Sequence, residues 1–178
     1  MKLPLLLLFV LSVTGITHAQ SPPKRKDNGI YLSYQDYLDG KLTQGFNKAD
    51  GVHFLENKKH SISIKTRDST YRFHHDETWG YRENNIDWRI WNEECYRIEY
   101  TGKICLYTLP GCLPCYTSAT LYFSNNITTA LHPLTRKNLV DVYHANTLFV
   151  QKIKKLPLTV SLEKLDKETK QYRFISWL

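Results

Sequence analysis

One pair of cysteines has the spacing of a redox motif. Cys112-Leu-Pro-Cys115 follows an apolar stretch and a proline-containing turn, residues 106–111. In a thiol-disulfide oxidoreductase, the first cysteine attacks as a thiolate that the start of a helix stabilises, and the second resolves the mixed disulfide. Residues 116–123 have the composition of a strand, so that helix is not expected. We therefore interpret the pair as a structural disulfide in an exported loop, with a redox role as the alternative.

The other two cysteines flank a predicted hairpin. If Thr101-Gly102 forms a two-residue turn, the numbers of opposed residues sum to 203, and Cys95 and Cys105 point to opposite faces of the sheet. They are then not expected to bond to each other, although a three-residue loop would reverse this parity. The predicted opposed pairs are Ile98 with Cys105, Tyr96 with Tyr107 and Glu99 with Ile104, and Tyr96, Ile98, Tyr100, Cys105 and Tyr107 share one face.

Four cysteines permit three complete disulfide pairings. A bridge between Cys112 and Cys115, with Cys95 and Cys105 as buried thiols, fits the predicted parity best. A bridge from Cys105 to one of the loop cysteines is the alternative. Because the spacing contains one close pair, a four-cysteine zinc site is not expected.

A run of metal-ligand side chains, His74-His75-Asp76-Glu77, is interpreted as the polar end of a strand. Adjacent residues in a strand point to opposite faces, and neither a His-x-His nor a helical His-x3-His spacing is present. The sequence also contains no phosphate loop, nucleophile elbow or EF-hand spacing. We therefore expect no metal and no cofactor, and a protein that is not an enzyme.

Basic residues concentrate near the end of the chain. The net charge is +7, and residues 134–178 carry nine Lys and Arg against four Asp and Glu. Lys152, Lys154 and Lys155 are predicted in the last turn of a helix, where they favour anionic partners such as lipid headgroups or polyanionic glycans. We nevertheless interpret these lysines as a solvated helix face, with binding to an anionic partner as the alternative, and nucleic acid is not an expected partner.

Aromatic residues suggest another kind of surface. The chain holds twelve Tyr and four Trp, and Trp79, Trp88 and Trp91 form a candidate exposed cluster for carbohydrate binding. We interpret them instead as side chains packed on half-buried sheet faces, with the exposed cluster as the alternative.

The N-terminus has the layout of a secretory signal. Lys2 precedes an apolar run over residues 3–13, and the small residues Thr17 and Ala19 occupy the positions before a cleavage site. This run is too short to span a bilayer as a helix, and no later stretch is long enough. We expect a signal peptide at 1–19, a flexible polar linker at 20–28 and a single domain at 29–178. The expected location is the periplasm or the extracellular space.

Alternating apolar residues predict the fold that positions these side chains. Residues 61–65, 70–73 and 87–92 alternate between apolar and polar side chains, and turn residues separate them, as in an antiparallel meander. Ser33 and Asp36 resemble a capping box for one helical turn that ends near Gly40.

The apolar spacing becomes helical after residue 134. Thr135, and then Asn146 or Thr147, are predicted N-caps of two helices, and residues 158–165 are a further candidate helix. The apolar C-terminal residues 172–178 are expected to dock onto the sheet. The predicted fold class is α+β, an antiparallel meander of about six or seven short strands followed by two or three C-terminal helices.

A resemblance to a group of other proteins rests on five short segments of the sequence. They are Gly29-Ile-Tyr-Leu-Ser-Tyr-Gln-Asp-Tyr37, Trp79-Gly-Tyr81, Tyr96-Arg-Ile-Glu-Tyr-Thr-Gly-Lys103, Tyr122-Phe-Ser124 and Leu134-Thr-Arg-Lys-Asn-Leu139. Together they resemble small exported proteins of Bacteroidota that have no established activity. The resemblance implies a bacterial envelope or periplasmic setting and a single domain that carries a signal. The resemblance supplies no site residues. Separately, we expect a non-enzymatic domain that binds or scaffolds an unidentified partner, such as an envelope protein or a glycan.

Overall fold

The computed structural model describes residues 28–46, 53–57, 60–66, 69–111 and 118–178. The predicted signal peptide, most of the predicted linker, and both Cys112 and Cys115 lie outside these residues. In the described part of the chain, no helix is long and apolar enough to cross a membrane.

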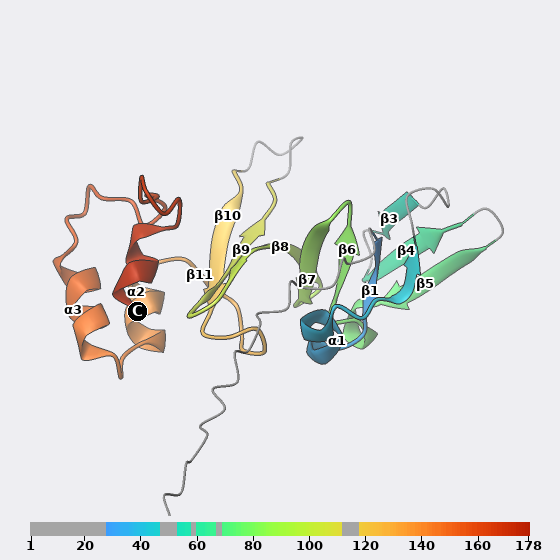
Figure 1. Ribbon diagram of the computed structural model, residues 1–178, viewed down its shortest axis with the longest axis horizontal. Helices are drawn as coiled ribbons and strands as arrows, with labels where there is room; N and C mark the ends of the chain where they lie inside the picture. Colours follow the sequence, from blue (N-terminus) through green and yellow to red (C-terminus); the bar gives the residue numbers. More distant parts are fainter. Residues whose placement is uncertain (1–27, 47–52, 58–59, 67–68, 112–117) are drawn as a thin grey trace, which may run out of the picture.

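The described strands form two antiparallel sheets (Figure 1). The larger sheet has the order β11-β10-β9-β8-β7-β6-β1-β2, and the smaller has the order β3-β4-β5. The strands of the larger sheet are β1 (Asn28–Tyr31), β2 (Thr43–Phe46), β6 (Gly80–Glu83), β7 (Ile86–Trp91), β8 (Glu94–Thr101), β9 (Cys105–Leu109), β10 (Thr120–Ser124) and β11 (His132–Pro133). The smaller sheet holds β3 (His53–Asn57), β4 (Ser61–Lys65) and β5 (Thr70–His74).

Helices lie mainly toward the C-terminus. The α-helices are α1 (Tyr34–Asp39), α2 (Arg136–Val142) and α3 (Thr147–Lys155). Two short 3-10 helices, η2 (His75–Glu77) and η4 (Arg173–Trp177), complete the described elements. Neighbours in sequence pair from β6 through β11, so the predicted α+β fold with an antiparallel meander and C-terminal helices is confirmed.

Local capping explains where the helices begin. Ser33 Oγ accepts from the backbone N–H of Asp36, and the Asp36 carboxylate accepts from the backbone N–H of Ser33, as the predicted capping box requires. Gly40 ends α1 with φ of 65°, a left-handed conformation that glycine adopts without strain. Thr135 caps α2 and Asn146 caps α3, both through their side chains.

The helix predicted over residues 158–165 is wrong. This segment forms turns, because the guanidinium of Arg136 in α2 binds two carbonyls just before it and one carbonyl within it. Nη1 donates to Leu156 at 2.6 Å, and Nη2 donates to Pro157 at 2.5 Å and to Val160 at 2.8 Å. In a helix these carbonyls would point along the helix axis and could not all reach the Arg136 guanidinium. The hydrogen bonds to Arg136 therefore favour the turn over a helix.

The loop between β8 and β9 differs from the predicted turn. Thr101 pairs with Cys105, which leaves Gly102, Lys103 and Ile104 as a three-residue loop. The two-residue turn at Thr101-Gly102 is therefore wrong, and so are the three opposed pairs derived from it. The physical reason is Ile104, which is completely buried in the core under the C-terminal helices instead of pairing across the hairpin.

A bulge restores the predicted parity further along the hairpin. The register shifts between Ile98 and Tyr100, and beyond this point Ile98 pairs with Tyr107. The extra residue compensates for the longer loop. Cys95 and Cys105 consequently lie in different hydrophobic clusters on opposite faces, as predicted. Tyr100 lies between the bulge and the loop, where the parity is not restored. It therefore packs on the face opposite to the predicted one.

Three clusters of buried side chains make up the described core. The first cluster joins the larger sheet to the C-terminal helices, so the predicted docking of the C-terminus is confirmed. The second joins the two sheets. The third covers the other face of β8 to β10. Their buried members are Ile104, Leu106, Phe123, Leu139, Phe149, Ile153, Phe174 and Ile175 in the first; Ile30, Ile62, Ile64, Tyr81, Ile90 and Cys95 in the second; and Tyr96, Cys105, Tyr107 and Leu131 in the third.

A buried arginine connects the strands beside the third cluster. Arg89 is 2% exposed, and its guanidinium donates to the Tyr107 hydroxyl and to the Thr129 carbonyl, both at 3.0 Å. The Tyr107 hydroxyl lies 3.0 Å from Ser124 Oγ, which donates to the Asn126 carbonyl at 2.6 Å. This chain of hydrogen bonds joins β7, β9, β10 and the loop that follows β10.

Two indole rings complete the surroundings of Arg89. Its guanidinium carbon lies 5.0 Å from the ring centre of Trp91 and 5.8 Å from that of Trp79. Such contacts stabilise a desolvated cation through the negative faces of the rings.

We expect Arg89→Ala to lower the free energy of unfolding by about 2–4 kcal/mol, because it removes two hydrogen bonds and leaves a cavity between the indoles. Urea denaturation followed by circular dichroism measures the change. Arg97→Ala is the control, because that side chain is 45% exposed and pairs with Glu99, an interaction worth at most about 1 kcal/mol. Equal losses in the two variants would contradict the role assigned to Arg89.

Candidate functional site

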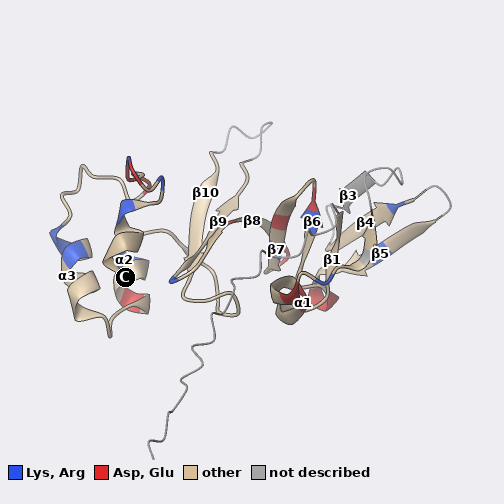
Figure 2. Cartoon of the chain, in the orientation of Figure 1, with Lys and Arg blue, Asp and Glu red and all other residues tan. Residues whose placement is uncertain are grey.

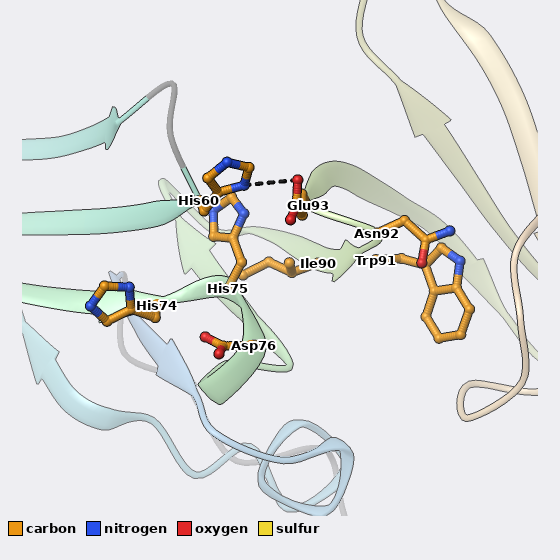
Figure 3. Close-up of a pocket in the computed structure, with 8 residues that line it drawn as sticks. All are labelled: His60, His74, His75, Asp76, Ile90, Trp91, Asn92 and Glu93. Carbon is orange, nitrogen blue, oxygen red and sulfur yellow. Dashed lines mark ion pairs between the residues drawn. The ribbon is translucent and has the colours of Figure 1, made fainter.

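A polar cleft opens where the smaller sheet meets the turn between β7 and β8 (Figure 3). Its volume is about 590 Å³, within the range of small-molecule sites. Ile90 belongs both to the cleft wall and to the cluster that joins the sheets, so the cleft borders the core between them. The lining residues are His60, His74, His75, Asp76, Ile90, Trp91, Asn92 and Glu93.

Two turns bring charged side chains across the cleft. Trp91 pairs with Glu94, so Asn92 and Glu93 form a two-residue turn with φ of 47° and 68°. Positive φ at both positions is typical of the type I′ turn that matches the twist of a hairpin. His60, with φ of 69°, immediately precedes β4. These conformations place Nδ1 of His60 2.8 Å from Oε2 of Glu93.

The pair of His60 and Glu93 bridges the two sheets. Both side chains are more than half exposed, so their attraction contributes at most about 1 kcal/mol to stability. Its consequence is geometric, because it fixes an imidazole and a carboxylate at one side of the cleft.

His75 is the most deeply buried polar side chain of the cleft. It is 9% exposed, and its backbone N–H donates to the carbonyl of His60 at 2.9 Å. Neither ring nitrogen has a hydrogen-bond partner among the described residues. Figure 3 shows the ring directed toward the pair of His60 and Glu93. A buried imidazole without partners is costly, so this site is suited to a ligand that both donates and accepts hydrogen bonds.

The structure corrects the interpretation of residues 74–77 as a strand end. His74 ends β5, but the next three residues form η2, so His74 and His75 do not alternate along one strand. Sequence reasoning singled out neither His60 nor Glu93. Their contribution depends on the packing of two hairpins, which no local spacing reveals. In the described residues, no group of three His, Cys, Asp or Glu is placed to hold a metal ion.

The three tryptophans do not form one exposed cluster. All three are half-buried, and they pack in different surroundings. Trp88 stacks on Tyr81 with ring centres 5.8 Å apart and an angle of 5° between the planes. Trp79 and Trp91 instead approach Arg89 on the other face of β7. Trp91 alone lines the cleft.

The described cysteines are held in the core. Cys95 is buried between the sheets, and Cys105 is a buried free thiol in the third cluster. Burial raises the pKa of the Cys105 thiol above its usual value, although hydrogen bonding with Tyr107 acts in the opposite direction. Cys112 and Cys115 lie outside the described residues. The described chain resumes at Ser118 and enters β10, a strand, at Thr120.

The predicted basic residues are on the surface. In α3, Phe149 and Ile153 face the core, whereas Lys152, Lys154 and Lys155 are exposed. Figure 2 shows these cations at one end of α3. Leu148 lies one turn before Lys152 and is 71% exposed.

We expect Cys105 to react with iodoacetamide only after unfolding, because burial disfavours the reactive thiolate and limits access to the sulfur. Labelling with and without urea, followed by mass spectrometry of the tryptic peptide that begins at Ile104, measures this. Fragment ions distinguish Cys105 from later cysteines in the peptide. Rapid labelling of Cys105 in the folded protein would contradict the prediction.

The comparisons with known proteins leave the site to be interpreted from its own geometry. No protein-family model matches the chain, and no match was found among curated proteins or among solved structures.

Proposed function

We propose that the protein is a non-enzymatic binding domain of the bacterial envelope, and that its cleft holds a sugar unit of a glycan. The observation that carries this proposal is the buried ring of His75, which lines the cleft and whose two nitrogens have no hydrogen-bond partner among the described residues. Each neutral imidazole offers one donor and one acceptor. A hydroxyl-bearing ligand supplies both complements.

The other walls of the cleft have matching chemistry. Asp76 and Glu93 provide carboxylate acceptors, and Asn92 provides an amide that both donates and accepts. The half-buried indole of Trp91 provides an apolar surface at the same site.

The envelope setting rests on the sequence. The pattern over residues 1–19 is that of a secretory signal, and the short motifs between Gly29 and Trp177 resemble exported proteins of Bacteroidota. A thiol-disulfide oxidoreductase that uses Cys112 and Cys115 is the alternative activity. It requires a helix after the motif, and the described chain there continues as a strand.

We expect His75→Phe to weaken saccharide binding at least about tenfold, because it removes two hydrogen-bonding nitrogens while retaining a ring of similar shape. Isothermal titration with N,N′-diacetylchitobiose, which offers hydroxyl and amide groups, measures the affinity. Urea denaturation should show unchanged or higher stability, since the nitrogens have no partner among the described residues.

His144→Ala is the matched control, because His144 is exposed beyond α2 and does not line the cleft. The absence of saturable binding to the unmodified protein would overturn the glycan proposal. Equal affinities of the unmodified protein and His75→Phe for the saccharide would show that the saccharide does not bind in the cleft. Release of a monosaccharide would contradict the non-enzymatic assignment.

A second function, attachment to anionic surfaces through α3, is favoured by one observation. Lys152 and Lys155 lie one turn apart on the solvent-facing side of α3, with the 71% exposed Leu148 on the same side. Exposed apolar side chains beside lysines are typical of helices that bind membrane surfaces.

We expect Lys152→Glu/Lys155→Glu to abolish sedimentation with vesicles of phosphatidylglycerol and phosphatidylcholine in equal amounts. Binding of the unmodified protein should fall as salt is added, because salt screens exposed charges. Lys103→Glu/Lys167→Glu is the control, with the same change of net charge at other exposed positions. Binding that is insensitive to salt, or equally lost in both variants, would exclude α3 as the attachment surface.

A further inference from the structure

A second cavity lies in the helical end of the molecule. It is enclosed by the end of α3, the turns that follow it and η4, and its volume is about 210 Å³. Figure 1 shows α3 and η4 at the end of the molecule opposite to β4 and β5, which border the polar cleft. The lining residues are Leu156, Val160, Ser161, Leu162, Lys164, Arg173, Phe174 and Trp177.

The walls and the rim of this cavity differ in chemistry. Leu156, Val160, Leu162, Phe174 and Trp177 provide an apolar interior, whereas Lys164 and Arg173 are exposed cations. No carboxylate is among the residues that line it. An apolar cavity with positive charge at its mouth matches a ligand that has an apolar tail and an anionic head.

Hydrogen bonds to the backbone fix the shape of the turns that surround the cavity. The carbonyls of Leu156, Pro157 and Val160 are bound by Arg136, which shapes the turn on one side. On the other side, the N–H of Arg173 donates to the carbonyl of Lys164 at 3.0 Å, so the two cationic residues are neighbours. This arrangement depends on main-chain contacts of Lys164 and Arg173 and leaves both charged side chains exposed.

An acidic side chain on this segment, that of Asp166, is already engaged in a turn. Asp166 accepts from the backbone N–H groups of Glu168 and Thr169, which hold its pKa below the usual value, with a smaller contribution from the charge of Arg173. Its carboxylate stabilises the turn of residues 166–169. Lys164 itself has no ion pair among the described residues.

We propose that this cavity binds the tail of a fatty carboxylate, with the carboxylate paired to Lys164 and Arg173. The volume is smaller than that of common drug-sized sites, so it accommodates a medium-length chain or part of a longer one. Each additional methylene that is buried should raise affinity about fourfold until the cavity is full. The site is independent of the glycan cleft and of the outer face of α3.

Isothermal titration with decanoate below its micelle concentration tests the proposal. We expect saturable binding to the full chain, stronger for decanoate than for octanoate. 1-Decanol, which lacks the charge, and decyltrimethylammonium, which reverses it, should bind at least about tenfold more weakly. Equal binding of all three ten-carbon probes would overturn the assignment of an anionic head.

Two kinds of variant separate the rim from the interior. Lys164→Glu/Arg173→Glu should weaken decanoate binding at least about tenfold, whereas Lys152→Glu/Lys155→Glu, with the same change of charge on α3, should leave it within about twofold. Val160→Phe fills the cavity and should abolish binding. Circular dichroism checks that each variant remains folded, since neither exposed side chain of the charge reversal lies in the core.

The outcomes distinguish this site from the other proposed functions. Loss of decanoate binding on reversal of the α3 lysines would assign the effect to the helix surface and overturn the cavity proposal. Binding of anionic vesicles without binding of free decanoate would do the same. Decanoate affinity that is unchanged in both Lys164→Glu/Arg173→Glu and Val160→Phe would also overturn it.

Discussion

The burial of Arg89 is the constraint on which the centre of the larger sheet depends. A guanidinium removed from water requires compensation, because its charge remains in the folded protein. Here the compensation comes from the Tyr107 hydroxyl, the Thr129 carbonyl and two indole faces. These groups come from separate segments, so one desolvated side chain holds β7, β9 and the loop after β10 in a single arrangement. The burial of Arg89 also fixes the orientation of β7, so that the neighbouring residue Ile90 points to the opposite face and lines the cleft.

The hairpin of β8 and β9 shows how two irregularities preserve an inside-outside pattern. A three-residue loop by itself reverses which residues of the two strands share a face, which would place Cys105 and Tyr107 on the wrong side relative to the rest of β8. The bulge between Ile98 and Tyr100 adds the compensating residue. The fully buried Ile104 and Tyr107 thereby occupy cores on opposite sides of the sheet. Burial of both faces selects this register over the simpler turn.

The two candidate sites differ because the cores beside them differ. The polar cleft forms at the border of two sheets, where turns with positive φ project His60 and Glu93 and where His75 lacks partners among the described residues. The apolar cavity forms between η4 and irregular turns whose carbonyls bind Arg136. Hydrogen-bonding groups without partners suit a polar ligand, and unfilled apolar space suits a hydrocarbon chain.

Features that depend on neighbours within a few residues could be predicted from the sequence alone. Ser33 with Asp36, Thr135 and Asn146 each contact a backbone group three positions away, and alternation specified most of the strands. The alternation along β7 also placed Trp88 opposite Arg89. The loop register, the absence of a helix over residues 158–165 and both candidate sites could not be predicted in this way, because they arise from tertiary contacts. Examples are the contacts of Arg136 with Val160 and of His60 with Glu93. The partners in each contact are more than twenty positions apart, so a local sequence pattern does not indicate that they interact.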